Sequence, residues 1–168
     1  YVESEENKGS TFIFSITFKD ATLNVSEAHP HQASFKGVEV LIVDDNVINC
    51  SILEKQCMQN QMVPFITTFP HQALEILETH PEIQVCLLDV SMPTIDGFTL
   101  ARQIREKYGS KPYIIMLSSI MKDEKETGFD RFISKPIKQS VLFNTIKSLL
   151  DVEQGVPAEV KEVKSEIQ

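Results

Sequence analysis

The chain has 168 residues, 42% of them hydrophobic and 24% charged, with a formal net charge of −8 and a pI near 5.0. This size and composition are typical of one soluble globular domain with flanking segments, and the acidic balance argues against direct binding to the phosphate backbone of nucleic acids. No apolar run approaches the about 20 residues that a helix needs to cross a bilayer, so we expect a cytoplasmic fragment without membrane contact of its own.

Residues 1–36 differ in character from the rest of the chain. The stretch TFIFSITF at 11–18 combines aromatic and β-branched residues with partial alternation, which predicts a strand. The stretch ATLNVSEAHPHQASFK at 21–36 has no sustained period and collects Ser, Asn, Pro and His, so we interpret it as a linker.

From residue 38 onward, short apolar runs alternate with stretches of helical period. The apolar runs predict strands at residues 38–43, 62–68, 83–89, 113–118 and 131–134. The periodic stretches predict helices at residues 47–58, 71–80, 97–108 and 140–150. Asn46 is placed to cap the first helix and Pro70 to open the second. Pro64 cannot donate to a ladder, which puts the second strand at a sheet edge.

This alternation predicts an α/β fold in which helices cover both faces of a parallel sheet through right-handed crossovers. In such sheets, ligands bind beyond the carboxyl ends of the strands. Polar residues end four of the predicted strands, and they are Asp44, Asp45, Asp89, Ser118 and Lys135. We therefore expect three carboxylates, a hydroxyl and an ammonium to meet at one edge of the sheet.

The chemistry of that set points to phosphoryl transfer. Three neighbouring carboxylates need a counter-ion, and Mg²⁺ prefers a few carboxylates together with waters and phosphate oxygens. Lys135 adds a point charge suited to a phosphate, and the Ser118 hydroxyl can donate a hydrogen bond to a phosphoryl oxygen. Asp89 is the best candidate nucleophile, because its strand is central and places it between the acidic pair and the lysine.

At these residues the chain resembles a response regulator receiver domain of the type fused to hybrid sensor histidine kinases. The resemblance covers roughly residues 37–150 and rests on four motifs in order: VLIVDDNVIN, LLDVSMPTIDGF, MLSS and GFDRFISKP. It implies a doubly wound, flavodoxin-like fold whose five parallel strands have the order 2-1-3-4-5. It also implies a phosphorelay function that depends on Mg²⁺, in which a histidine kinase core or a histidine phosphotransfer protein is the partner.

The resemblance also implies a role for each matching residue around the metal. Asp89 corresponds to the phosphoacceptor and is also a metal ligand. Asp45 corresponds to a direct Mg²⁺ ligand, and Asp44 to a carboxylate that holds a metal-bound water. The main-chain carbonyl of Ser91 completes the metal shell.

A second group of matching residues corresponds to the family's switch. Ser118 resembles the hydroxyl that turns toward the phosphoryl group, and Lys135 resembles the charge partner of the phosphoryl oxygens. Phe132 resembles the aromatic residue whose rotamer follows phosphorylation. The resemblance also implies a cis bond between Lys135 and Pro136, a form that X-Pro bonds take at low cost.

The flanking segments extend the same parentage. The stretch ENKGSTFIFSITF at 6–18 resembles the final strands of a histidine-kinase ATP-binding domain. We therefore divide the chain into a kinase remnant (1–20), a linker (21–36), a receiver domain (37–152) and a charged tail (153–168). The nucleotide-binding boxes and the phosphorylated histidine helix of a kinase do not occur here, so we expect this fragment to catalyse only its own phosphorylation and dephosphorylation. The parent protein is expected to be a histidine kinase anchored in the membrane.

Two features depart from the family pattern. Residues 119–127 must hold the whole fourth helix, so we expect that helix to be short or irregular and the output surface to be reduced. Ile120 lies two residues after the switch hydroxyl, where its apolar side chain would hinder water and lengthen the life of the phosphorylated state.

Two alternatives stay open at this point. A degenerate receiver would bind a protein partner without being phosphorylated. An aspartate-nucleophile phosphatase would carry a second acid two residues after the nucleophile as general acid, and this chain has Ser91 there.

Overall fold

A computed structural model describes residues 1–5, 8–17, 35–119 and 127–153. The chain divides into two compact units, residues 1–31 and 32–168, and each is described by itself. None of the helices in the described parts of the chain is long and apolar enough to span a bilayer.

The first unit contains an antiparallel hairpin of β1 (Val2–Glu5) and β2 (Gly9–Phe12). The predicted strand at 11–18 is therefore wrong in its extent, since residues 13–17 lie outside any strand, and β1 was not predicted. Ile13 still exchanges backbone hydrogen bonds with Tyr1, one residue beyond the paired strands.

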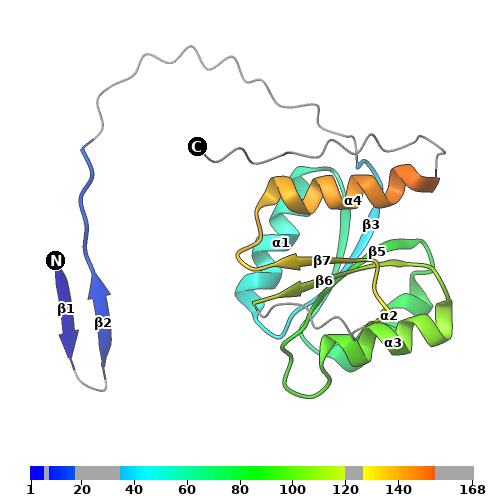
Figure 1. Cartoon of the computed structure of the whole chain (residues 1–168), viewed down its shortest axis with the longest axis horizontal. Coiled ribbons are helices and arrows are strands. Elements are labelled where there is room, and N and C mark those ends of the chain that lie inside the picture. The colour runs from blue at the N-terminus through cyan, green and yellow to red at the C-terminus, as the bar shows by residue number, and fades with distance from the viewer. Residues whose placement is uncertain (6–7, 18–34, 120–126, 154–168) are drawn as a thin grey trace, which may run out of the picture. The chain divides into compact units, whose positions relative to one another are not determined.

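The second unit is built on a parallel sheet of five strands (Figure 1). The strands are β3 (Glu39–Val43), β4 (Val63–Thr67), β5 (Ile83–Asp89), β6 (Tyr113–Ser118) and β7 (Arg131–Ser134). Their order across the sheet is β4-β3-β5-β6-β7, which is the predicted order 2-1-3-4-5. The strand that contains Pro64 lies at the edge, as expected.

Helices cover both faces of this sheet. They are α1 (Val47–Gln59), α2 (Ala73–Thr79) after a 3₁₀ turn η1 (Pro70–Gln72), α3 (Gly97–Tyr108) and α4 (Gln139–Glu153). Figure 1 shows α1 and α4 on one face and α2 and α3 on the other. Asn46 caps α1 as predicted, because its side chain accepts the N–H of Ile48 at 2.9 Å.

Each face has its own buried core. In β3, Val40 and Ile42 pack with α1 and α4, whereas Leu41 and Val43 pack with α2 and α3. Because both faces are covered, the strand is apolar at successive positions instead of alternating with polar residues. The three cysteines, Cys50, Cys57 and Cys86, are buried free thiols.

The short fourth helix was predicted within residues 119–127, of which residues 120–126, Ile120 included, lie outside the described residues. The described residues on either side, Ser119 and Thr127, belong to no helix. After Thr127, a Cβ atom at Gly128 would lie 3.4 Å from Cγ of Arg102 in α3.

Candidate functional site

The carboxyl ends of four strands bring the predicted polar residues together. Asp44 and Asp45 directly follow β3, Asp89 ends β5, Ser118 ends β6 and Lys135 directly follows β7. One carboxylate oxygen from each aspartate lies within 4.8 Å of the others. This closeness follows from the parallel topology, which carries every strand to the same edge.

Lys135 bridges two of the three carboxylates. Its Nζ donates to Oδ1 of Asp89 at 2.8 Å and to Oδ2 of Asp44 at 3.0 Å. Burial lowers the pKa of this ammonium, but the hydrogen bonds and charges of Asp89 and Asp44 outweigh burial, and the pKa lies above the ordinary lysine value. Lys135 is therefore charged at neutral pH and offsets one of the three negative charges. The charge that remains matches a divalent cation.

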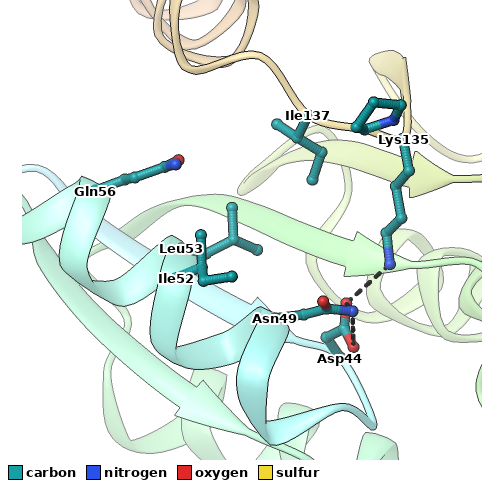
Figure 2. Close-up of a pocket in the computed structure, with 8 residues that line it drawn as sticks. Asp44, Asn49, Ile52, Leu53, Gln56, Lys135 and Ile137 are labelled. Carbon is teal, nitrogen blue, oxygen red and sulfur yellow. Dashed lines mark hydrogen bonds and ion pairs between the residues drawn. The ribbon is translucent and has the colours of Figure 1, made fainter. Parts of the chain in front are cut away.

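The two adjacent aspartates differ in their surroundings. Asp44 is 1% exposed, and its Oδ1 accepts the backbone N–H of Asn46 at 2.9 Å. Its carboxylate also accepts the side-chain amide of Asn49, which sequence reasoning overlooked (Figure 2). Asp45 is exposed. The carboxylate of Asp44 is thus occupied by protein donors, whereas that of Asp45 is open to a ligand from solvent.

Asp89 lies where α3 begins, and a glycine makes this possible. A Cβ atom at Gly97 would lie 2.1 Å from the main-chain oxygen of Asp89 and 2.8 Å from Cε of Met116. The N–H of Gly97 donates to the carbonyl of Val90 at 3.1 Å. The first residue of α3 therefore packs directly on the end of β5. Gly97 was not identified from the sequence. The available signal was the presence of a glycine at the first position of a predicted helix.

The remaining predicted residues lie at the end of β6, on β7 and on the loop after β5. Ser118 is 1% exposed, and its main-chain oxygen accepts the N–H of Lys135 at 2.6 Å. Ser91 is exposed on the loop after β5. Phe132 is partly buried, and its ring centroid lies 6.3 Å from that of Phe129.

The chain continues from Lys135 through a cis peptide bond to Pro136, as predicted. A second cis bond, between Lys111 and Pro112, was not predicted.

Comparison with known proteins assigns this arrangement to a family. The model of the response regulator receiver domain matches residues 40–147, which include all the strand ends described above. The chain belongs to the response regulator receiver domain family. The expected fold and the expected family are therefore both confirmed.

Curated proteins similar to this receiver are sensor and hybrid kinases. The autoinducer 2 sensor kinase/phosphatase LuxQ of Vibrio vulnificus is 32% identical over 154 residues, which cover 86% of this chain and 18% of that protein. The aerobic respiration control sensor protein ArcB of Escherichia coli is 28% identical over 163 residues, which cover 90% of this chain and 20% of that protein. The chain thus spans about a fifth of the length of these relatives.

Solved receivers share the fold. A two-component response regulator/GGDEF domain protein is 28% identical, with a TM-score of 0.64, and the match covers 70% of this chain and 50% of that one. The receiver domain of a sensor histidine kinase from Pseudomonas aeruginosa is 24% identical, with a TM-score of 0.62, over 68% of this chain and 98% of that one. That domain was crystallised with a magnesium ion coordinated in its active-site cleft.

A pocket of about 270 Å³ opens beside the acidic cluster of this receiver. It lies between α1 and the segment after β7, and its lining residues are Asp44, Asn49, Ile52, Leu53, Gln56, Lys135, Pro136 and Ile137 (Figure 2). Ile52 is 51% exposed and forms part of its apolar wall. Sequence reasoning did not find this pocket, because its two sides are far apart along the chain.

Proposed function

We propose that this receiver accepts a phosphoryl group on Asp89 from a phosphohistidine. The observation that carries the proposal is the bridge that Lys135 makes between Asp89 and Asp44 beside a third carboxylate. In the reaction, an Asp89 carboxylate oxygen forms a bond to phosphorus as the P–N bond to the donor breaks. The electron pair of that bond returns to the imidazole nitrogen, and Asp89 becomes an acyl phosphate.

The donor set fits a hard divalent cation. Three carboxylates are offset by one ammonium, and all the candidate ligand atoms are oxygens, which Mg²⁺ prefers. Asp45, Asp89 and the main-chain carbonyl of Ser91 would hold Mg²⁺ directly, and Asp44 would hold it through water. The bound ion supplies positive charge against the charge that develops on the phosphoryl oxygens.

Lys135, Ser118 and Phe132 would respond once Asp89 is phosphorylated. Lys135 already contacts the Asp89 carboxylate, so a small movement brings its ammonium to a phosphoryl oxygen. The Ser118 hydroxyl would donate to another phosphoryl oxygen, and the ring of Phe132 would change rotamer with it. Such a change in a few side chains is the local event that a signalling switch requires.

We further propose that the donor is a histidine kinase core or a histidine phosphotransfer protein and that it docks on the pocket beside the site. Ile48 and Ile52 are one helical turn apart on α1 and are 68% and 51% exposed. An apolar face of this kind favours a partner helix, and the pocket opens onto Lys135. We place the fragment in the cytoplasm, as part of a parent chain anchored in the membrane.

The assignment of the flanking segments also belongs to the proposal. The matches to LuxQ and ArcB cover 86% and 90% of the chain and so extend beyond residues 40–147. This extent supports our view that residues 1–20 end a kinase ATP-binding domain, residues 21–36 are a linker and residues 153–168 are a tail. The fragment itself would then catalyse only its own phosphorylation and dephosphorylation.

Intact mass after incubation with acetyl phosphate and Mg²⁺ tests the phosphoacceptor. We expect a gain of one phosphoryl group, about 80 Da, which is lost on omitting Mg²⁺ and in Asp89→Asn. Asp96→Asn is the matched control, because it changes an exposed aspartate on the following loop and keeps the oxygen that caps α3. A receiver that gains no mass from acetyl phosphate or from a phosphohistidine donor would instead be the degenerate binding module.

A further inference from the structure

Asn49, in the first turns of α1, makes a contact that the proposed reaction leaves without a role. Its Nδ2 lies 3.1 Å from Oδ1 and 3.0 Å from Oδ2 of Asp44, so one amide group spans both oxygens of the carboxylate (Figure 2). A donor shared by both oxygens holds the whole carboxylate against the first turn of α1.

Each of the other two donors to Asp44 bonds to a single oxygen. The backbone N–H of Asn46 bonds only to Oδ1, and the ammonium of Lys135 bonds only to Oδ2. Lys135 is also bonded to Asp89 and is expected to move toward the phosphoryl group. When it does so, Asn49 becomes the side chain that still holds Oδ2.

The side chain of Asn49 is neutral, which suits a residue that supports a metal site. A lysine or arginine at position 49 would repel an incoming cation, whereas a neutral amide binds the carboxylate and leaves its negative charge available. Asp44 is 1% exposed, so its carboxylate depends on donors that the protein supplies.

The backbone around Asn49 is fixed relative to Asp44. The Sγ of Cys50 donates to the main-chain oxygen of Asp44 at 3.2 Å, and the N–H of Cys50 donates to the carbonyl of Asn46 at 3.1 Å. Asn46 in turn caps the helix at Ile48. The side chain of Asn49 therefore starts from a rigid first turn, which is what a positioning residue needs.

From these contacts we propose that Asn49 is a positioning residue that orients Asp44 toward the metal-bound water of the receiver site. The proposal rests on the proposed function, because it assumes that Mg²⁺ binds at the acidic cluster. It adds a residue outside the carboxylates and assigns it to metal affinity and not to the transfer of the phosphoryl group.

Asn49→Leu tests the proposal, since leucine nearly matches asparagine in shape and removes the amide. We expect the Mg²⁺ dissociation constant, measured by isothermal titration calorimetry, to rise about 10-fold, as is typical when a ligand loses its hydrogen-bond partner. Phosphorylation by acetyl phosphate should be slower at low Mg²⁺ and return to near the wild-type rate at saturating Mg²⁺. The amide resonance of Asn46, which donates to Asp44, should shift in the metal-free variant.

Asn60→Ala is the matched control. It removes another asparagine amide bonded to α1, at 2.9 Å from the carbonyl of Gln56, at the end of the helix away from the site. It should leave the Mg²⁺ dissociation constant unchanged. A merely structural role for Asn49 would lower the rate equally at every Mg²⁺ concentration.

Two outcomes separate the two proposals. A wild-type receiver that binds Mg²⁺, beside an Asn49→Leu variant that binds it within twofold, would overturn the role of Asn49 and leave the proposed function intact. A wild-type receiver that neither binds Mg²⁺ nor accepts a phosphoryl group would overturn the proposed function itself.

Discussion

The two faces of the sheet support the same acidic cluster by different means. On the α1 side, hydrogen bonds from Asn46 and Asn49 hold the carboxylate of Asp44, and an open pocket lies next to them. On the α3 side, the support comes from close packing, since Gly97 lies against Asp89 and the rings of Phe132 and Phe129 are neighbours. Hydrogen bonds with an open pocket suit the entry of a donor, and packed side chains suit the transmission of a change.

The largest expected effect comes from changing Lys135, which contacts an aspartate supported from each face of the sheet. Lys135→Met removes the ammonium that bridges Asp44 and Asp89. Loss of one such charge at a reacting centre typically costs about 100-fold in rate, and we expect phosphorylation by acetyl phosphate to slow by that order. Lys138→Met, an exposed lysine three residues on, should keep the wild-type rate. Equal phosphorylation rates in the two variants would show that Lys135 has no role in phosphoryl transfer.

The α3 side is tested by adding one methyl group. Gly97→Ala places a Cβ atom against the main-chain oxygen of Asp89, so α3 or β5 must shift. We expect the free energy of unfolding in urea to fall by about 2 kcal/mol, together with slower phosphorylation. Gly109→Ala is the control, because it has open space around it and only a positive φ to strain, and it should cost about 1 kcal/mol. A Gly97→Ala variant as stable as wild type would contradict the packing argument.

The α1 side is tested by a charge in the pocket wall. Ile52→Glu should slow transfer from a phosphorylated protein donor about 10-fold, since a central apolar contact is worth more than about 1 kcal/mol. It should leave phosphorylation by acetyl phosphate unchanged, because the small donor needs no docking surface. Met58→Glu makes the same change at an exposed position of α1 that does not line the pocket. If Ile52→Glu and Met58→Glu behave alike, the docking surface lies elsewhere.

The smallest expected effect is a pH dependence in the alkaline range. Because the pKa of Lys135 is raised in the folded protein, its contribution to stability is fully present below the ordinary value of 10.5 and is lost as the pH rises through the folded pKa. The urea midpoint of wild type should therefore fall more steeply above pH 10.5 than that of Lys135→Met. Parallel curves would show that the ion pairs of Lys135 add no stability.

The sequence predicted those parts of the molecule that depend on local pattern. The bounds of β5, α3, β6 and β7 agree with the predicted ranges, because continuous apolar runs and helical periods mark segments that are covered on both faces or on one. The clustering of the strand ends followed from the topology alone.

What the sequence did not predict depends on contacts between distant segments. In the sequence, Asn49 is only a polar residue on a helix, and its contact with Asp44 appears only in the structure. In the same way, Gly97 is only a weak helix former in the sequence, and the structure places it against Asp89. The pocket needs Ile137 opposite α1. The predicted strand at 11–18 was wrong in its extent for a related reason, because the length of a strand depends on its partner strand as much as on its own residues.

The proline in β4 has a consequence for a protein with several sheets on one chain. The exposed edge of a sheet is a template for any strand nearby, and segments joined in one chain meet at effectively millimolar concentration. The β1–β2 hairpin of this chain has two strands of that kind, with every residue of both exposed. Pro64 has no N–H to offer, so an incoming strand would find a gap in the ladder at β4. One imino acid thus protects the free edge of the receiver sheet against the addition of a further strand.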